Sequence, residues 1–190
     1  MKQKAMQEQM SRLHRAVRRC RKCPLHEHRI LAVPGCGPPG ARIMFIGEAP
    51  GRQEDRQGKP FVGMAGKALD RMLTSIKLPR NQTYITSAVK CRPPDNRTPH
   101  VGELEICKAN WLDRQVELID PAVIVLLGST AVRQMLGRSG PVTAVHGRII
   151  ERHGRRCLPT FPPAAAMRFP KIRAMMSEDF RLLKSILQTP

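Results

Sequence analysis

Residues 121–136, PAVIVLLGSTAVRQML, carry the strongest fold signal in the chain. Their first half is an unbroken apolar run, which is typical of a strand buried on both faces of a parallel sheet. Gly128 ends the run, and Ser129 can cap a helix that continues to Leu136. Because a buried strand followed at once by a helix is the repeating unit of parallel sheets, this stretch predicts an α/β protein.

Further strand and helix signals alternate on both sides of this unit. Short apolar runs predict strands, and apolar residues at spacings of three and four predict helices. The alternation predicts a mainly parallel sheet with helices on both faces, whose ligands bind at the carboxyl ends of the strands. We expect strands at 41–47, 83–89, 121–128, 142–145, 148–150 and 156–159, and helices at 2–19, 67–76, 103–118, 129–136 and 173–187.

Length and charge bound the size of the protein and the kind of partner. The chain has 190 residues, enough for one domain with a substantial core and few for two. It holds 33 Lys and Arg against 15 Asp and Glu, a net charge of +18 that favours DNA, RNA or an anionic membrane surface. No apolar run approaches the ~20 residues that span a bilayer, and the charged N-terminus does not resemble a signal peptide. We therefore expect a cytoplasmic protein with reduced cysteines.

Four cysteines have a pattern that indicates metal ligation. Two form a C-x2-C pair followed by Pro24, and two lie far downstream. Four sulfur ligands suit either Zn²⁺ or a [4Fe–4S] cluster, and one tight pair with two scattered cysteines favours the cluster without deciding the choice. Cys36 and Cys157 have no such pattern, and we interpret them as ordinary half-buried residues. The four candidate ligands are Cys20, Cys23, Cys91 and Cys107.

Three polar or proline-containing segments follow predicted strands. They are GEAPG at 47–51, KCRPPDNR at 90–97 and FPPAAAMR at 161–168. Because the carboxyl ends of parallel strands meet at one edge of a sheet, we expect the three segments to lie together and to form the functional site.

Four blocks of the sequence resemble one known family. The blocks are CRKCPL (20–25), GEAPGRQEDRQGKPFVGMAGKALDRML (47–73), YITSAVKCRPPDNRTP (84–99) and IDPAVIVLLGSTAVRQMLG (119–137). In this order they resemble the family-four uracil-DNA glycosylases, the iron–sulfur branch of that superfamily, from about Arg18 to Arg168. The resemblance implies one domain over residues 1–190, a three-layer α/β/α sandwich with a central four-stranded parallel sheet, and a monomer that acts on single- or double-stranded DNA. It also implies that the four cysteines hold a structural [4Fe–4S] cluster.

The resemblance assigns roles in the base pocket. It implies that Glu48 and the backbone around Ala49 line the pocket, and that Phe61 stacks on the flipped base. Glu54 is expected near the reacting centre, where it would orient or deprotonate water. Glu48 and Glu54 are therefore the candidate catalytic residues.

Two positions depart from the family pattern. The family carries Asn where this chain has Ser87, and a hydroxyl cannot supply the paired donor and acceptor of an amide. The family also carries His where this chain has Pro162, and that His donates to the uracil oxygen as negative charge develops. Removing one such donor typically lowers the rate about 10²–10³-fold. His146, on a predicted turn, is available as a substitute, although a His at such a position is more often a surface residue.

Several side chains are candidates for DNA contact. In the family, the segment that matches 164–168 enters the minor groove, so Met167 is a candidate wedge and Arg168 a candidate phosphate ligand. Arg92 and Arg97 are further phosphate candidates. The basic C-terminal helix adds Lys171, Arg173, Arg181 and Lys184.

Three functional hypotheses remain. The first is a DNA-repair glycosylase that excises a deaminated base, for which uracil is the expected substrate, or one adapted to hypoxanthine or xanthine. Glu48, Glu54 and Phe61 favour it. The second, which Ser87 and Pro162 favour, is a non-catalytic iron–sulfur DNA-binding protein. The third, a zinc-bound nucleic-acid module, leaves the GEAPG block unexplained.

Overall fold

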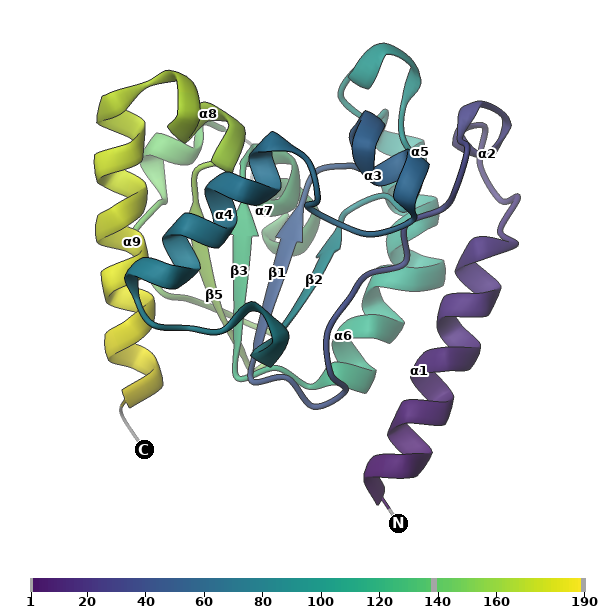
Figure 1. Cartoon of the computed structure of the whole chain (residues 1–190), viewed down its shortest axis with the longest axis horizontal. Coiled ribbons are helices and arrows are strands. Elements are labelled where there is room, and N and C mark those ends of the chain that lie inside the picture. The colour runs from purple at the N-terminus through teal and green to yellow at the C-terminus, as the bar shows by residue number, and fades with distance from the viewer. Residues whose placement is uncertain (1, 138–139, 189–190) are drawn as a thin grey trace.

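The computed structural model, which describes residues 2–137 and 140–188, is built around a twisted five-stranded sheet (Figure 1). The first four strands in the spatial order run parallel, as expected, and the fifth is antiparallel to its neighbour. The order is β2 (Thr83–Ser87), β1 (Ile43–Gly47), β3 (Val123–Leu127), β5 (Arg155–Thr160) and β4 (Ile150–Arg152).

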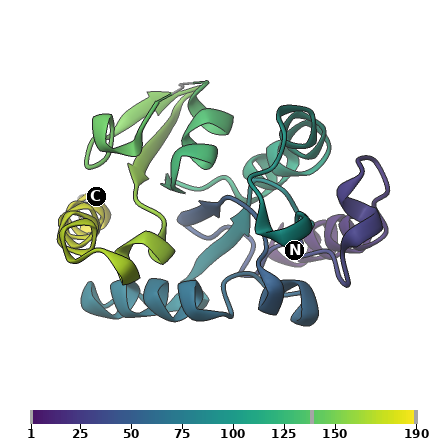
Figure 2. The same cartoon turned by 90° about the horizontal axis from the view of Figure 1, so that it is seen from above.

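Helices cover both faces of the sheet, and Figure 2 shows α4 along one side and α7 along the other. The segment expected as one helix over 103–118 is continuous, but its middle is a π-helical stretch at Lys108–Leu112. The α-helices are α1 (Lys2–Arg18), α2 (Leu25–His28), α3 (Arg52–Gln57), α4 (Met64–Ser75), α5 (Val101–Cys107), α6 (Asp113–Ile119), α7 (Ser129–Leu136), α8 (Pro163–Arg168) and α9 (Pro170–Gln188); short 3₁₀ turns lie at Arg80–Gln82, Pro94–Asn96 and Val142–Ala144.

Alternate residues of the strands feed two hydrophobic cores, one on each face. In β1, Met44 and Ile46 join a core with residues of α1, α6 and α7. Ile43 and Phe45 point the other way and join a core with residues of α4, α8 and α9. Because every residue of β1 and β3 is buried, these strands need the unbroken apolar runs seen in the sequence. The α/β class is therefore confirmed as a three-layer arrangement.

Two expectations about the last third of the chain are wrong. Residues 142–145 do not form a strand: Val142–Ala144 is a 3₁₀ turn, in which Val142 is buried after Pro141 while its neighbours stay exposed. The sheet also has five strands instead of four. The fifth, β4, arises because His153 and Gly154 adopt positive φ of 50° and 71°, which closes a two-residue hairpin between β4 and β5.

Each edge of the sheet has a feature that limits pairing with another strand. At one edge, β4 carries the charged side chains of Glu151 and Arg152. At the other, Cys36 pairs with Ile85 of β2 through two backbone hydrogen bonds of 2.9 and 2.8 Å. Gly37 permits this approach, because a Cβ at that position would lie 2.2 Å from the Thr83 carbonyl oxygen. Within the described residues, no helix has the length and apolar character needed to cross a membrane.

The half-buried His14 predicts a pH dependence of stability. Its Nε2 lies 2.8 Å from the Tyr84 hydroxyl, and burial, with smaller effects of the Arg18 and Lys90 charges, lowers the pKa of His14 to about 4. Since the ordinary pKa is about 6.5, the unfolded chain takes up the proton first as pH falls. The stability that neutral His14 contributes is thus fully present above pH 6.5 and is lost as pH falls toward 4.

We expect the free energy of unfolding of His14→Gln to fall by about 2 kcal/mol less than that of the wild type as pH is lowered from 7 to 4. Urea unfolding at pH 7, 5.5 and 4 measures it, with His28→Gln on an exposed histidine as the control. An unchanged slope of stability against pH in His14→Gln would contradict the assignment.

Candidate active site and cysteine site

The carboxyl ends of β1, β3 and β5 enclose a cavity of about 250 Å³. Each strand supplies part of the wall through the residues that follow it. The cavity therefore brings the GEAPG and FPPAAAMR segments together, as the strand order requires. Its lining consists of Gly47, Glu48, Ala49, Phe61, Ala65, Leu127, Gly128, Ser129, Pro162, Pro163 and Ala164.

Glu48 is held in the cavity wall from two directions. The hydroxyl of Thr130, a buried residue in the first turn of α7, donates a short hydrogen bond to Glu48 Oε2. The Glu48 carbonyl oxygen accepts the backbone N–H of Val89 at 3.2 Å, which ties the GEAPG segment to the residues after β2. Among the described residues, Oε1 of Glu48 has no hydrogen-bond partner. One carboxylate oxygen is thus fixed while the other can face a ligand.

Phe61 lies against two glycines that leave room for its ring and backbone. A Cβ at Gly47 would lie 2.6 Å from Phe61 Cζ, and one at Gly66 would lie 1.9 Å from the Phe61 carbonyl oxygen. Phe61 itself adopts φ of +51°, a left-handed conformation that non-glycine residues rarely take. Such strain persists only where the surroundings impose it, and it often marks a functional site.

Glu54 supports Phe61 instead of lining the cavity. Its Oε1 accepts the backbone N–H groups of Val62 and Gly63, each at 2.8 Å. These bonds hold the loop between α3 and α4, and with it the strained Phe61. Water activation by Glu54 stays a prediction, and its contacts favour a positioning role.

The two positions that depart from the family pattern differ in exposure to the cavity. Ser87 is 3% exposed, is not among the lining residues, and pairs with Gly47 in the sheet register. Pro162 lines the cavity with a ring that would lie 3.5 Å from a Cβ on Gly128. The cavity wall at residue 162 is therefore apolar.

Ser129 and Thr130 are site residues that the sequence analysis missed. Ser129 was expected to be the helix cap, but the N-cap is Gly128, with φ of 100°, and Ser129 is the first helical residue. The Ser129 side chain is therefore available to the cavity that it lines. The signal was the glycine directly before the serine, since glycine is itself accepted at the N-cap.

His146 lies behind the FPPAAAMR segment, outside the cavity lining. Its ring packs on Phe161 with centroids 4.6 Å apart, and its Nδ1 is 3.0 Å from Oδ1 of the buried Asp179. Thr160 donates to the other carboxylate oxygen of Asp179 at 2.5 Å. This network holds the end of β5, and it gives His146 no place among the groups that face the cavity.

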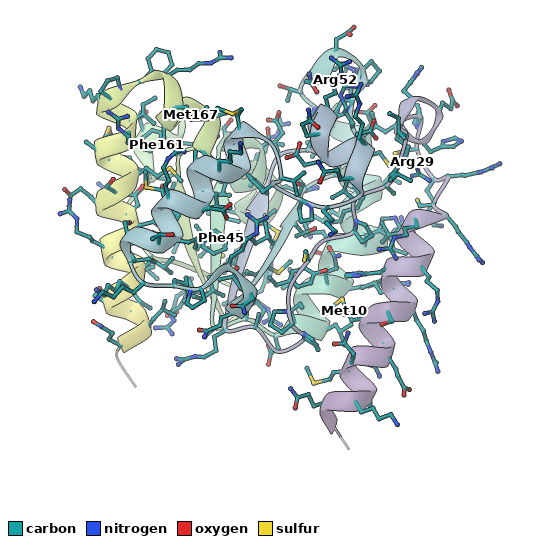
Figure 3. All side chains as sticks on the ribbon, viewed as in Figure 1. Met10, Arg29, Phe45, Arg52, Phe161 and Met167 are labelled. Atoms are coloured by element: carbon teal, nitrogen blue, oxygen red, sulfur yellow. The ribbon has the colours of Figure 1, made fainter. Side chains whose placement is uncertain are left out.

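The candidate DNA contacts have different surroundings. Met167 is 37% exposed and Arg168 is exposed, both on α8 beside the cavity, and Figure 3 shows Met167 at the end of the molecule where the parallel strands finish. Arg92 donates through Nε to Asn96 Oδ1 at 2.8 Å. Arg97 pairs with the nearly buried Glu103 at 2.7 Å, and its hydrogen bonds lower the pKa of that carboxyl. Arg97 is thus engaged within the protein.

The four candidate metal ligands lie around one pocket, far apart in sequence but close in space. Cys20, Cys23, Cys91 and Cys107 line it together with apolar residues and Lys90. No group of three or more His, Cys, Asp or Glu in 2–137 or 140–188 is arranged to hold a metal ion. The four cysteines share this pocket, and four sulfur ligands are a set that either zinc or an iron–sulfur cluster takes.

Cationic and N–H groups surround these sulfurs. Arg29 Nη1 donates to Cys91 Sγ at 2.9 Å, and Trp111 Nε1 donates to Cys20 Sγ at 3.2 Å. Burial raises the pKa of the Cys107 thiol to about 12 and lowers the pKa of the fully buried Lys90 to about 8. Lys90 Nζ donates to the Thr86 hydroxyl at 2.7 Å and to the Ser87 carbonyl oxygen at 2.6 Å.

The fold and the cavity define an α/β protein whose ligand site lies at the carboxyl edge of a parallel sheet. The model of the Uracil DNA glycosylase superfamily matches residues 34–184. Type-4 uracil-DNA glycosylases of Sulfurisphaera tokodaii, Saccharolobus solfataricus and Thermotoga maritima are 40, 44 and 39% identical to the chain over 96, 91 and 96% of its length and 87, 84 and 96% of theirs. The chain therefore belongs to the type-4 family of the uracil DNA glycosylase superfamily.

Proposed function

We propose that the protein is a DNA-repair glycosylase that flips uracil out of DNA and hydrolyses its glycosidic bond. One observation supports this proposal: Phe61 and Glu48 line the same cavity, and Thr130 fixes the Glu48 carboxylate through one oxygen. A flat base needs an aromatic face to stack on, and the reacting sugar needs a negative charge beside it.

In this proposal the base stacks on Phe61 and the sugar lies toward Glu48. The bond between C1′ and the base nitrogen breaks, and its electron pair leaves with uracil as an anion. Positive charge develops on the sugar, and the Glu48 carboxylate stabilises it. Water then adds to C1′; its hydroxyl oxygen bonds to the sugar and the released proton neutralises the base.

The departing anion needs a donor that Pro162 cannot provide. The first turn of α7 offers backbone N–H groups without intrahelical partners, and the helix dipole adds partial positive charge there. Ser129, at this helix start, lines the cavity beside Pro162. We propose that this helix start serves as the electrostatic partner of the uracil oxygen.

The four cysteines form, in this proposal, the ligand set of a [4Fe–4S] cluster. The donor set and the surroundings fit such a group, because a cluster with four thiolates is anionic and the pocket presents Arg29, Lys90 and the Trp111 N–H to it. The cluster would have a structural role, because it would join α1 to the residues after β2 and to α5. One domain, a monomeric state and a cytoplasmic location also stay predictions.

Single-turnover release of base from oligonucleotides tests the function. Substrates carry uracil, hypoxanthine, xanthine or thymine in single and double strands, and the released base is identified by mass. We expect uracil to be released. Release of a purine alone would assign another lesion, and no release from protein that binds DNA with intact cysteine ligation would leave the non-catalytic hypothesis.

Phe61→Leu tests the stacking role within this assay. Leucine keeps an apolar side chain but has no aromatic face, and stacking on one base is worth about 1–3 kcal/mol. We expect the concentration of uracil-containing DNA that gives half the maximal rate to rise about tenfold. Met72→Leu, in the core of the same helix layer, is the control, and an equal effect there would contradict stacking.

A further inference from the structure

A second cavity, of about 550 Å³, shares no lining residue with the base pocket. Its walls come from the end of α1, from α2 and the residues after it, and from the end of α3. Every ionisable side chain in its lining is basic, and two exposed apolar residues complete it. The lining is Arg18, Arg21, His26, Arg29, Ile30, Leu31, Ala32, Gln57, Gly58 and Lys59.

Three of the cations that line this cavity have no side-chain partner within the described residues. Arg18, Arg21 and Lys59 are exposed, and in the described part of the chain none of their side chains forms an ion pair or hydrogen bond. Arg29 differs, because it donates to Cys91 Sγ and to the carbonyl oxygens of Arg18 and Cys20. Three cations thus lie around one concave surface, and within the described residues none of them is paired with a carboxylate.

The wall of the cavity is built by a buried carboxylate. Asp55 of α3 is fully buried, and its Oδ1 accepts the backbone N–H of Ile30 at 2.9 Å. The Leu31 N–H donates to the Asp55 carbonyl oxygen at 3.1 Å. These bonds fix the segment after α2 against α3 and leave Ile30 63% and Leu31 45% exposed at the cavity.

The basic cavity and the base pocket share one stretch of chain. Lys59 lines the first and Phe61 lines the second, and two residues span at most about 7 Å. Phosphates along one DNA strand are spaced by a similar distance. A strand whose base lies on Phe61 would therefore have a neighbouring phosphate close to Lys59.

We propose that the basic cavity binds the sugar–phosphate backbone of the lesion-bearing strand, on one side of the flipped nucleotide. This inference rests on the proposed function for the position of that nucleotide. Arg21 and Lys59 neutralise adjacent phosphates, while Ile30 and Leu31 cover the intervening sugar. The cavity supplies affinity that does not depend on base sequence.

The salt dependence of DNA binding tests the inference without requiring excision. Fluorescence anisotropy with a single-stranded oligonucleotide that lacks uracil gives Kd at several salt concentrations. Since each phosphate contact contributes about 0.7 to the slope of log K against log salt, Arg21→Gln with Lys59→Gln should reduce the slope by about 1.4. We expect Kd at low salt to rise about tenfold. The control pair is Lys4→Gln with Arg42→Gln, exposed cations away from the cavity.

A slope equal to that of the wild type, or an equal reduction in the control pair, would overturn the inference. Arg21 lies between two candidate ligands, so the iron content of each variant is measured. If Arg21→Gln lowers the iron content, the test rests on Lys59→Gln alone, which should reduce the slope of log K against log salt by about 0.7.

A uracil oligonucleotide with single neutral methylphosphonates then locates the contact. Neutralising phosphates next to the uracil on one side should weaken binding by the wild type and not by the double variant. Equal sensitivity in both proteins would overturn the placement. If the protein shows these effects but releases no base, the inference about the basic cavity stands and the assignment as a glycosylase is wrong.

Discussion

Replacing Pro162 with histidine should raise the rate of uracil release by about 10²–10³-fold. This is the range that one donor to a developing anion is typically worth, and the resemblance to the family implies a histidine at this position. Pro162 lines the cavity beside Ser129, so an imidazole there would face the space that the base occupies.

The backbone accepts this change. Pro162 has φ of −67° and ψ of 136°, an extended conformation that histidine adopts readily and that the following Pro163 also favours. The single-turnover rate at saturating DNA is the measurement. Pro162→Ala removes the ring without adding a donor and should show no such gain, so equal rates for the two variants would show that residue 162 does not meet the departing base.

Replacing Cys107 with serine should abolish iron binding and lower the melting temperature by at least about 10 °C. Coordination free energy is folding free energy when the ligands come from distant segments. For a chain of this length, 10 °C corresponds to about 3–5 kcal/mol. Cys107 is nearly buried in a core that contains Val17, Leu25 and Trp111, so loss of the cluster would loosen α1 and α5 together.

Cys157→Ser is the matched control, because Cys157 is as buried as Cys107 but lies in the core beneath α6 and α7. It should lose some stability and keep its iron. Iron and zinc are both measured by elemental analysis. Full iron in Cys107→Ser would contradict the ligand assignment, and zinc in place of iron in the wild type would favour the zinc hypothesis.

The parallel strands could be predicted because their residues are buried on both faces. That burial requires unbroken apolar runs such as VIVLL in β3, and few other secondary structures need such runs. Residues 142–145 could not be predicted in this way. Val142 and Val145 are three positions apart, a spacing that suits either a strand or a turn, and Pro141 and the hairpin at His153–Gly154 decide between these two structures.

The location of the site could be predicted from the strand ends, but its internal contacts could not. Glu48 meets Thr130 across 82 positions of sequence, and this pair depends on how β1 and α7 approach one another. Glu54 stands in a charged run that favours a solvated loop, yet the short helix α3 turns it toward the N–H groups of Val62 and Gly63. Contacts of this kind follow from tertiary packing and have no local pattern.

The covered edges of the sheet bear on how the protein behaves when crowded. An open strand edge is a template for pairing with another copy, and it is a common origin of aggregation. Here the charged strand β4 closes one edge, and the Cys36–Ile85 bridge closes part of the other. Two copies brought together would therefore carry the same net charge of +18 and would have little open strand edge through which to join their sheets.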